Sequence, residues 1–370
     1  SSAILHPFRT RVRRLLAWLA HHHALVDGAL FVAFVSAAVA VSATTFVSAL
    51  LHQTGGEWSA PLDDVFIHFD YARSTARGYP FHWSDGNGYS CGNTSVIYPF
   101  VRALGYLAGF RDTSLMAFAV GVAALSVAVF FVGLSRFIAE AGRHAKYLAV
   151  AAVLALGALS WSLWSGMENA LHLGIWGVCA HIAARTEDRL RSGRPSLALS
   201  WWLGLWGALL CMTRPESVAC VFAFGVFVFI AGYRRGKLTS LSRMVAVGLP
   251  SVLAIAALSV ANYALTGESS QAGAVAKLAV HHPYLSTEAK IQDWVSNLHY
   301  ILTRTTLHHF SSVKPYGLLL PALAACAVLV KSVRLRVASL WLQIVLWCLI
   351  VGLNGQVRWQ NERYVMSAVA

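Results

Sequence analysis

The recurrence of long apolar runs constrains this chain more than any other feature of its sequence. Runs of about 17 to 25 residues follow one another from end to end, the length that a helix needs to cross a hydrocarbon core of about 30 Å. Inside a bilayer each backbone polar group must be satisfied within the protein, so helices are the default. A membrane barrel would instead show alternating segments of about ten residues, and none are present. The sequence predicts an all-α, polytopic transmembrane helical bundle.

About nine spans can be placed on these runs. They are residues 27–51, 113–137, 145–164, 168–184, 197–212, 216–233, 244–265, 315–331 and 338–354. The apolar segment 98–110 has only about 13 residues, which is too short to cross, and predicts an interfacial or partly re-entrant helix. Two long loops, about 52–112 and 266–314, then fall on one side, and loops of such length are usually functional.

The formal net charge of +13 raises the question of a nucleic-acid partner. Lys and Arg instead sit mostly in short loops between apolar runs, and such basic loops face the cytoplasm. Residues 1–26 are therefore predicted to be a basic cytoplasmic N-terminus, and residues 27–370 a single membrane domain whose two long loops are non-cytoplasmic. No nucleic-acid partner is expected. An apolar run begins shortly before Ala370, so the native chain is expected to continue.

Asp63 and Asp64 follow the first span directly. Adjacent carboxylates raise each other's pKa, and the pair is suited to a general base or a cation. The alternative is a helix N-terminus, where acidic residues satisfy free amides and favour the helix dipole.

Two tight turns on the same side also carry charge. Glu168 ends the turn Ser-Gly-Met-Glu, and Arg214 and Glu216 belong to Thr-Arg-Pro-Glu. Helix caps or a structural ion pair explain them as well as a site does. However, ionisable residues at a membrane edge are costly, and function is the default interpretation.

Basic residues gather in the second long loop and in the tail. Lys277, His281, His282 and Arg363 suit an anionic phosphate. Attraction to anionic lipid headgroups is the alternative. The sequence has no Gly-rich phosphate loop, nucleophile elbow or HExxH motif. ATP hydrolysis, serine hydrolysis and metalloprotease chemistry therefore have no support.

The order of the motifs resembles the GT-C glycosyltransferases. The first long loop carries Asp-Asp-x-x-Ile-x-x-x-Tyr-Ala-Arg over residues 63–73, followed by Gly-x-Thr-Ser at 92–95 and Tyr-Pro at 98–99. The turns at 166–168 and 213–216 follow in order, then Lys277 and the sequence Glu-Arg-Tyr at 362–364. Within the superfamily the chain is most similar to bacterial enzymes that use polyprenyl-phosphate sugars, arabinofuranosyltransferase-like and mannosyltransferase-like members included.

The resemblance implies transfer of a sugar from a polyprenyl-phosphate donor to an acceptor hydroxyl on a glycan, lipid or protein, with inversion, outside the cytoplasm. It implies that Asp63 is the general base and that Asp64 supports it, orients a sugar or helps to hold a divalent cation such as Mg²⁺ or Mn²⁺. Lys277 and Arg363 would bind the donor phosphate. Substrate contacts are also expected from a wider set: Tyr71, Glu168, Arg214, Glu216, His281 and His282. A bacterial inner membrane is implied, with the site facing the periplasm.

The chain departs from the family pattern at Ser74-Thr75, where Asn is usual, and at Ser367, where Pro is usual nearby. A catalytically inactive scaffold or assembly subunit of a membrane complex is therefore the alternative, because fold does not imply function. A transporter would place charges at mid-bilayer and break its helices in matching halves, and the sequence favours charges at helix ends.

Overall fold

The computed structural model describes residues 23–311, 313 and 316–370. The predicted basic segment 1–26 therefore lies almost entirely outside the described residues, as does the first residue of the predicted span 315–331. The described part is helical apart from its loops, and it contains no β-strand, only an isolated bridge between Leu278 and Asn354. The predicted all-α class is confirmed.

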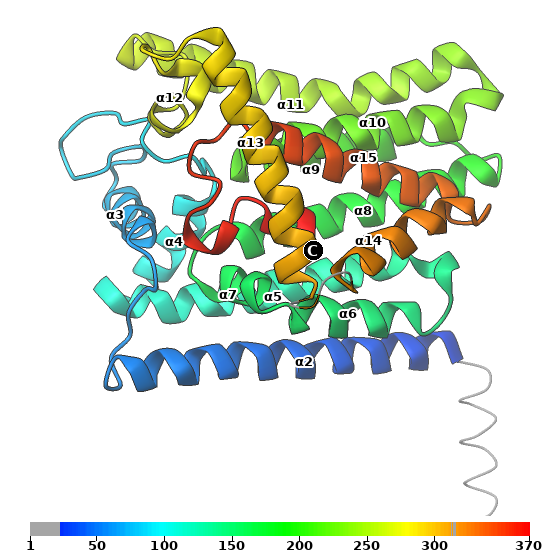
Figure 1. Cartoon of the computed structure of the whole chain (residues 1–370), viewed down its shortest axis with the longest axis horizontal. Helices are drawn as coiled ribbons and strands as arrows, with labels where there is room; N and C mark the ends of the chain where they lie inside the picture. Colours follow the sequence, from blue (N-terminus) through cyan, green and yellow to red (C-terminus); the bar gives the residue numbers. More distant parts are fainter. Residues whose placement is uncertain (1–22, 312, 314–315) are drawn as a thin grey trace, which may run out of the picture.

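The helices form a bundle that lies lengthwise in Figure 1, with short helices packed at one end. Their bounds are α2 (His23–Gln53), α3 (Asp64–Ala76), α4 (Tyr98–Leu107), α5 (Leu115–Phe137), α6 (Ala145–Ala155), α7 (Gly157–Trp164), α8 (Asn169–Arg191), α9 (Leu197–Thr213), α10 (Val218–Gly232), α11 (Lys237–Thr266), α12 (Ala272–Lys277), α13 (Thr287–Arg304), α14 (Tyr316–Cys326), α15 (Arg334–Val351) and α16 (Met366–Val369). A π-helical turn, Thr305–His309, extends α13.

The two ends of the bundle differ in what they carry. The loops after α5, α8, α10 and α14, which the sequence analysis assigned to the cytoplasm, gather at one end, here called the basic end. Helices α3, α4 and α12 lie at the other, here called the outer end. Helix α4 has ten residues, in keeping with a segment too short to cross a bilayer.

Five described helices are long and apolar enough to cross a membrane, or six if one bent pair counts as a span. They cover the predicted spans in α2, α5, α10, α11 and α15. Three other predicted spans correspond to α8, α9 and α14, which do not meet this criterion of length and composition. Helix α8 is less apolar than the others, since it contains Asn169, His172 and His181 and ends in charged residues.

The predicted span 145–164 is not one straight helix. It is divided into α6 and α7, which meet at an angle of 81°. Leu156 between them has ψ 106°, an extended conformation that ends α6 and starts α7 on a new axis. The break makes room beside α7 that a straight helix would fill.

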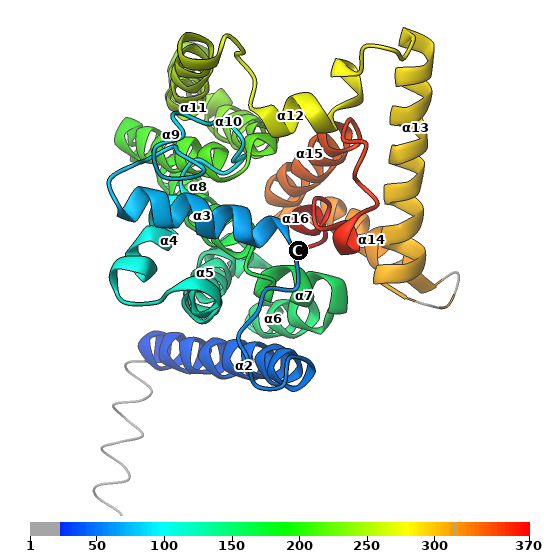
Figure 2. The same ribbon diagram turned by 90° about the vertical axis from the view of Figure 1, so that its left-hand side faces the viewer.

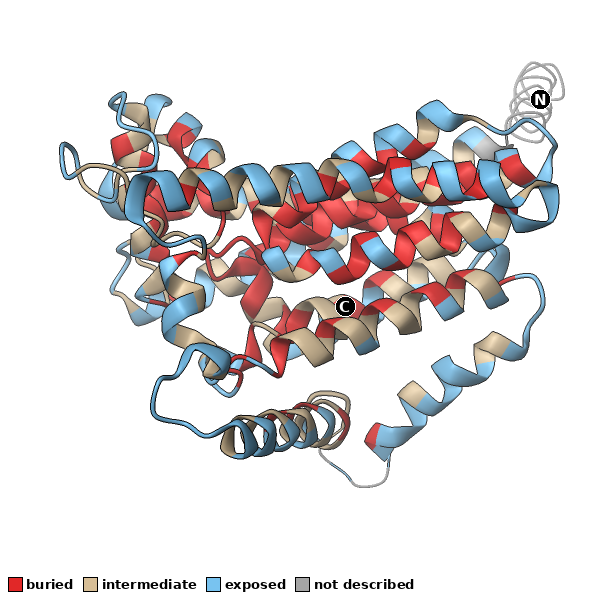
Figure 3. Ribbon diagram, turned by 90° about the horizontal axis from the view of Figure 1, so that it is seen from above, coloured by how far each residue is buried: buried red, intermediate tan, exposed pale blue. Residues whose placement is uncertain are grey.

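Buried residues run along the middle of the bundle, while the outward helix faces are exposed (Figure 3). Helices α5 and α8 cross closely because glycines lie at their contact. A Cβ atom on Gly133 would lie 2.0 Å from the carbonyl oxygen of Gly177, and one on Gly177 would lie 2.6 Å from the Cα of Phe130. Small residues allow such backbone approach, which supplies packing where lipid gives no hydrophobic drive.

Carboxylates and arginines compensate one another at the basic end. Arg336 of α15 is buried and lies 2.6 Å from Glu187 and 3.3 Å from Asp188, both of α8. Glu187 also pairs with Arg191 at 2.6 Å. Because a buried charge is tolerated only when it is paired, this network fixes α15 against α8 at the end of the molecule opposite the long loops.

The close approach of α5 and α8 predicts a sharp difference between two glycines of the same helix. Gly133→Ala should lower the free energy of unfolding by about 1–3 kcal/mol or more, since the methyl group must displace backbone. Gly121→Ala is the matched control, because its Cβ would meet nothing within 4 Å, and it should stay within about 1 kcal/mol of the wild type. Reversible unfolding in mixed micelles measures both, and equal effects would contradict the packing described.

Candidate active site

Five separate segments bring polar side chains together at the outer end. They are the start of α3, the α7–α8 turn, the α9–α10 turn, the end of α12 and the segment before α16. The last four of these segments border a pocket of about 200 Å³, here called the outer pocket, and the start of α3 lies beside it without lining it. Its polar lining consists chiefly of Thr94, Glu168, Thr213, Arg214, Glu216, Gln271, Lys277, Asn354, Arg363 and Tyr364.

Asp64 is held by the two cations that the sequence analysis assigned to phosphate. Its Oδ2 accepts a short hydrogen bond from Arg363 Nη2 and lies 4.0 Å from Lys277 Nζ. Tyr364 ties the same cations together, since its hydroxyl lies 3.2 Å from Lys277 Nζ and 3.0 Å from Arg363 Nη2. This carboxylate oxygen is occupied by cations, which suits a positioning role better than proton abstraction.

Glu168 lies in the turn before α8 and is buried between His68 and Arg214. His68 Nε2 of α3 is 3.3 Å from one carboxylate oxygen, and Arg214 Nη1 is 3.5 Å from the other. Burial alone would raise the pKa of Glu168, but His68, Arg214 and Arg363 outweigh it and hold the pKa well below its usual range. Glu168 is therefore an anion in the folded protein.

Arg214 is fixed by several partners. Its Nη1 donates to Asn169 Oδ1 at 2.6 Å, and its Nη2 lies 3.4 Å from Glu216 Oε1. The guanidinium group also lies over the ring of Tyr364, 5.4 Å from the centroid. Burial lowers the pKa of Arg214, and the nearby carboxylates of Glu216 and Glu168 more than restore it, so the net direction is upward. The structural ion pair considered for this turn is present.

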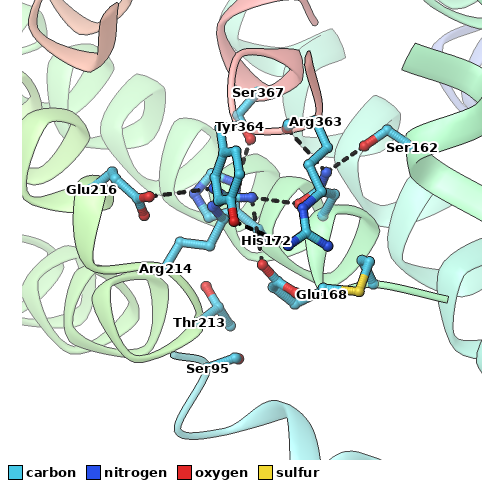
Figure 4. Close-up of polar contacts among 12 residues, drawn as sticks. Ser95, Ser162, Glu168, His172, Thr213, Arg214, Glu216, Arg363, Tyr364 and Ser367 are labelled. Carbon is cyan, nitrogen blue, oxygen red and sulfur yellow. Dashed lines mark hydrogen bonds and ion pairs between the residues drawn. The ribbon is translucent and has the colours of Figure 1, made fainter. Parts of the chain in front are cut away.

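The cations around the outer pocket keep unused donors. In Figure 4 the side chains of Arg214 and Arg363 converge beside Glu168. Arg363 Nη1 and Arg214 Nε are buried and find no hydrogen-bond partner among the residues that the structure describes. An unpaired buried donor costs free energy, and a ligand oxygen would remove that cost. The pocket thus combines donors that lack a protein acceptor with the carboxylates of Glu168 and Glu216.

Asp63 lies beside this cluster, and its surroundings differ from those of Asp64. Its side chain is exposed and accepts from the backbone N–H of Asp64 at 2.9 Å, so it caps α3. Beyond this bond it meets only the amide of Gln360, 3.5 Å away. No described cation pairs with it. The Asp63 carboxylate therefore caps α3 and is also accessible to a substrate hydroxyl.

A metal would find few ligands in the described residues. Residues 23–311, 313 and 316–370 contain no group of three or more His, Cys, Asp or Glu side chains placed to hold an ion. Asp63 and Asp64 are the carboxylates at the start of α3, and the Arg363 and Lys277 side chains already face Asp64. A divalent cation here would need substrate oxygens to complete its shell.

Three of the predicted substrate residues lie away from the outer pocket. His281 and His282 are exposed on the loop after α12 and do not line it. Tyr71 is buried, and its hydroxyl donates to Ser90 Oγ at 2.7 Å, so it secures the loop after α3. The side-chain directions of adjacent histidines on a loop cannot be predicted from sequence alone. The position of His281 and His282 relative to Lys277 and Arg363 was therefore not predictable.

Other residues of the site received no role from the sequence, although Tyr98 and Tyr364 stand in the motifs quoted above. His68 contacts Glu168, and the Tyr364 hydroxyl contacts Lys277 and Arg363. Arg102 and Tyr98 of α4 support the turn that carries Glu168, since both donate to the Gly166 carbonyl, Tyr98 at 2.8 Å. Burial raises the pKa of Tyr98 to about 12, so it stays a donor. An arginine inside the apolar segment 98–110 was the available signal for such a role.

No family model, no curated protein and no solved structure matches the chain. The resemblance to GT-C glycosyltransferases therefore stays a prediction that depends on the motifs themselves.

The burial of Glu168 predicts a pH-dependent loss of stability. Glu168→Gln should lower the free energy of unfolding by about 3 kcal/mol at pH 7, since it breaks a buried, charge-paired cluster. The pKa is lower in the folded state, so the wild-type advantage is complete above the unfolded value of about 4.3 and shrinks as the pH falls below it. Unfolding measured from pH 7 to pH 3 checks this, with exposed Glu57→Gln as control. A deficit independent of pH would contradict the assignment.

Proposed function

We propose that the protein is a membrane glycosyltransferase of the GT-C type. It transfers a sugar from a polyprenyl-phosphate donor to an acceptor hydroxyl, with the reaction at the outer end of the bundle. The observation that carries the proposal is the outer pocket, where Arg214, Lys277 and Arg363 face one space and buried guanidinium nitrogens lack partners. A lipid phosphate brings the oxygens that these donors require, and apolar helices beside the pocket provide its membrane surroundings.

The chemistry requires one base and one anion site. The acceptor oxygen attacks the anomeric carbon, its proton passes to a carboxylate, and the bond from that carbon to the phosphate oxygen breaks. Asp63 is the proposed base, because its carboxylate is exposed and faces no described cation. Lys277 and Arg363 stabilise the charge that develops on the departing phosphate, a large effect in a site that excludes water. One base with in-line attack inverts the anomeric centre.

Asp64 has a supporting role in this proposal. Its ion pair with Arg363 and its approach to Lys277 keep both cations pointed at the pocket before substrate binds. Preorganised charges need no rearrangement when the reaction occurs. A divalent cation such as Mg²⁺ or Mn²⁺ belongs to the same proposal: Asp63 and Asp64 would hold it, and it would neutralise charge on the phosphate.

The proposed membrane orientation follows from the position of the basic loops. The basic end would face the cytoplasm and the outer end the periplasm of a bacterial inner membrane, as positive loops direct. The partners would be the lipid-linked sugar, a glycan, lipid or protein acceptor, and the surrounding membrane lipids.

Transfer of radiolabelled sugar from a panel of polyprenyl-phosphate sugars in proteoliposomes tests the proposal. Asp63→Asn should lower kcat/KM by about 10²- to 10⁴-fold, the range for removal of a general base. Lys277→Met should lower it by about 10²-fold, as for loss of a donor to the departing oxygen. Thermal unfolding should change little in either variant, because both side chains are partly exposed.

Asp70→Asn is the matched control. It removes a carboxylate from the same helix, where Asp70 forms an exposed ion pair with Arg73, and activity should persist. Equal activity of Asp63→Asn and wild type would remove Asp63 as the base. No transfer by the wild type from any donor, with cell-envelope acceptors and divalent cations supplied, would favour the scaffold subunit instead.

A further inference from the structure

A second polar pocket lies on the other side of the segment that carries Arg363. It measures about 370 Å³ and is here called the side pocket. The end of α13 and its π-helical turn approach α7 and α16 there. Helix α13 runs along the side of the bundle (Figure 2), and Trp294 and Asn297 bond it to the end of α15. The polar and aromatic residues that line it are Trp161, Arg304, His308, His309, Asn361 and Glu362.

The break between α6 and α7 forms one wall. Leu156 to Leu159 line the pocket at the bend, where Gly157 and Ala158 leave space. Trp161 follows one turn later, and it is neither fully buried nor fully exposed. A flat aromatic ring beside an open space provides an apolar platform that can cover one face of a ring-shaped ligand.

Glu362 fixes the opposite wall. Its carboxylate accepts from Tyr300 at 2.5 Å, Arg304 Nε at 3.1 Å and His309 Nε2 at 3.0 Å. This leaves the outer nitrogens of Arg304 and the ring of His308 without a hydrogen-bond partner among the described residues. Several donors therefore border the pocket in fixed positions.

The charges of the side pocket nearly cancel. Arg304 is balanced by Glu362. Burial lowers the pKa of His309, an effect that Glu362 only partly opposes. The outer pocket differs, since three cations (Arg214, Lys277 and Arg363) and two carboxylates (Glu168 and Glu216) line it. A neutral ligand with many hydroxyl groups fits the side pocket better than an anion does.

The segment between the pockets is strained. Gln360, Asn361 and Glu362 all have positive φ, at 54°, 54° and 53°. Such conformations in residues other than glycine persist where the surroundings over-determine them, and they cluster at ligand sites. The result is that Glu362 faces the side pocket while its neighbour Arg363 faces the outer pocket, and the Gln360 amide approaches Asp63.

From this arrangement we infer that the side pocket binds a neutral carbohydrate, which stacks on Trp161 and takes hydrogen bonds from Arg304, His308 and Asn361. The identification of this carbohydrate as the acceptor rests on the proposed function. The inference that the side pocket binds a carbohydrate does not depend on that function. Glu362 is a positioning residue that holds Arg304 and His309.

Saturation-transfer NMR tests binding without any turnover. The probes are neutral methyl glycosides and the matching methyl glycuronosides, added to the full protein in lipid nanodiscs, since glycosidic detergents would compete. Trp161→Ala and His308→Ala should each weaken binding of the neutral probes about tenfold, as expected for loss of one good contact. The controls are Trp202→Ala and His299→Ala, both exposed and outside the pocket, and they should bind as the wild type does.

The outcomes separate the two proposals. Unchanged binding in both pocket variants, or tighter binding of the glycuronosides than of the neutral probes, would overturn the inference. Intact binding without sugar transfer would refute the proposed enzyme and keep the carbohydrate site. If transfer does occur, Trp161→Ala should raise the acceptor KM about tenfold and leave the donor KM unchanged.

Discussion

A buried carboxylate holds the outer end together. Glu168 is enclosed between His68 of α3 and Arg214 of the α9–α10 turn, so one anion links three segments that are far apart in sequence. Each of these charges would be costly alone, and the group is stable only when all are present. Arg102 and Tyr98 hold the preceding turn from the other side. The geometry of Lys277, Arg363 and Asp64 is built against this fixed cluster.

The apolar pattern was sufficient to predict the helical bundle and the positions of most helices, because lipid leaves few alternatives for a backbone. It could not predict the break at Leu156, since the residues on either side are apolar and carry no helix-ending signal besides Gly157. Nor did it separate spanning helices from a helix such as α8, which is largely buried within the bundle and ends in a paired charge network. Hydropathy reports how apolar a helix is, but it does not show whether lipid or another helix covers it.

The candidate site was predictable as a set of segments and not as a set of contacts. Carboxylates and arginines at helix ends indicated Asp64, Glu168, Arg214, Lys277 and Arg363, and the fold brings these together. Sequence could not pair Asp64 with Arg363 across 299 positions, or distinguish it from its neighbour Asp63. It also placed His281 and His282 with the cations by composition alone, whereas side-chain direction on a loop depends on contacts that composition does not contain.

Two adjacent residues that face two pockets give the proposed reaction a geometric basis. In-line displacement needs the acceptor oxygen and the leaving phosphate on opposite sides of the anomeric carbon. Arg363 faces a pocket suited to phosphate, Glu362 faces one suited to a neutral sugar, and Asp63 lies at the segment between them through Gln360. The strained conformation of residues 360–362 is what turns neighbouring side chains to opposite sides. A relaxed helix in this position would separate successive side chains by about 100°, which follows from its 3.6 residues per turn, and would not divide the two pockets in the same way.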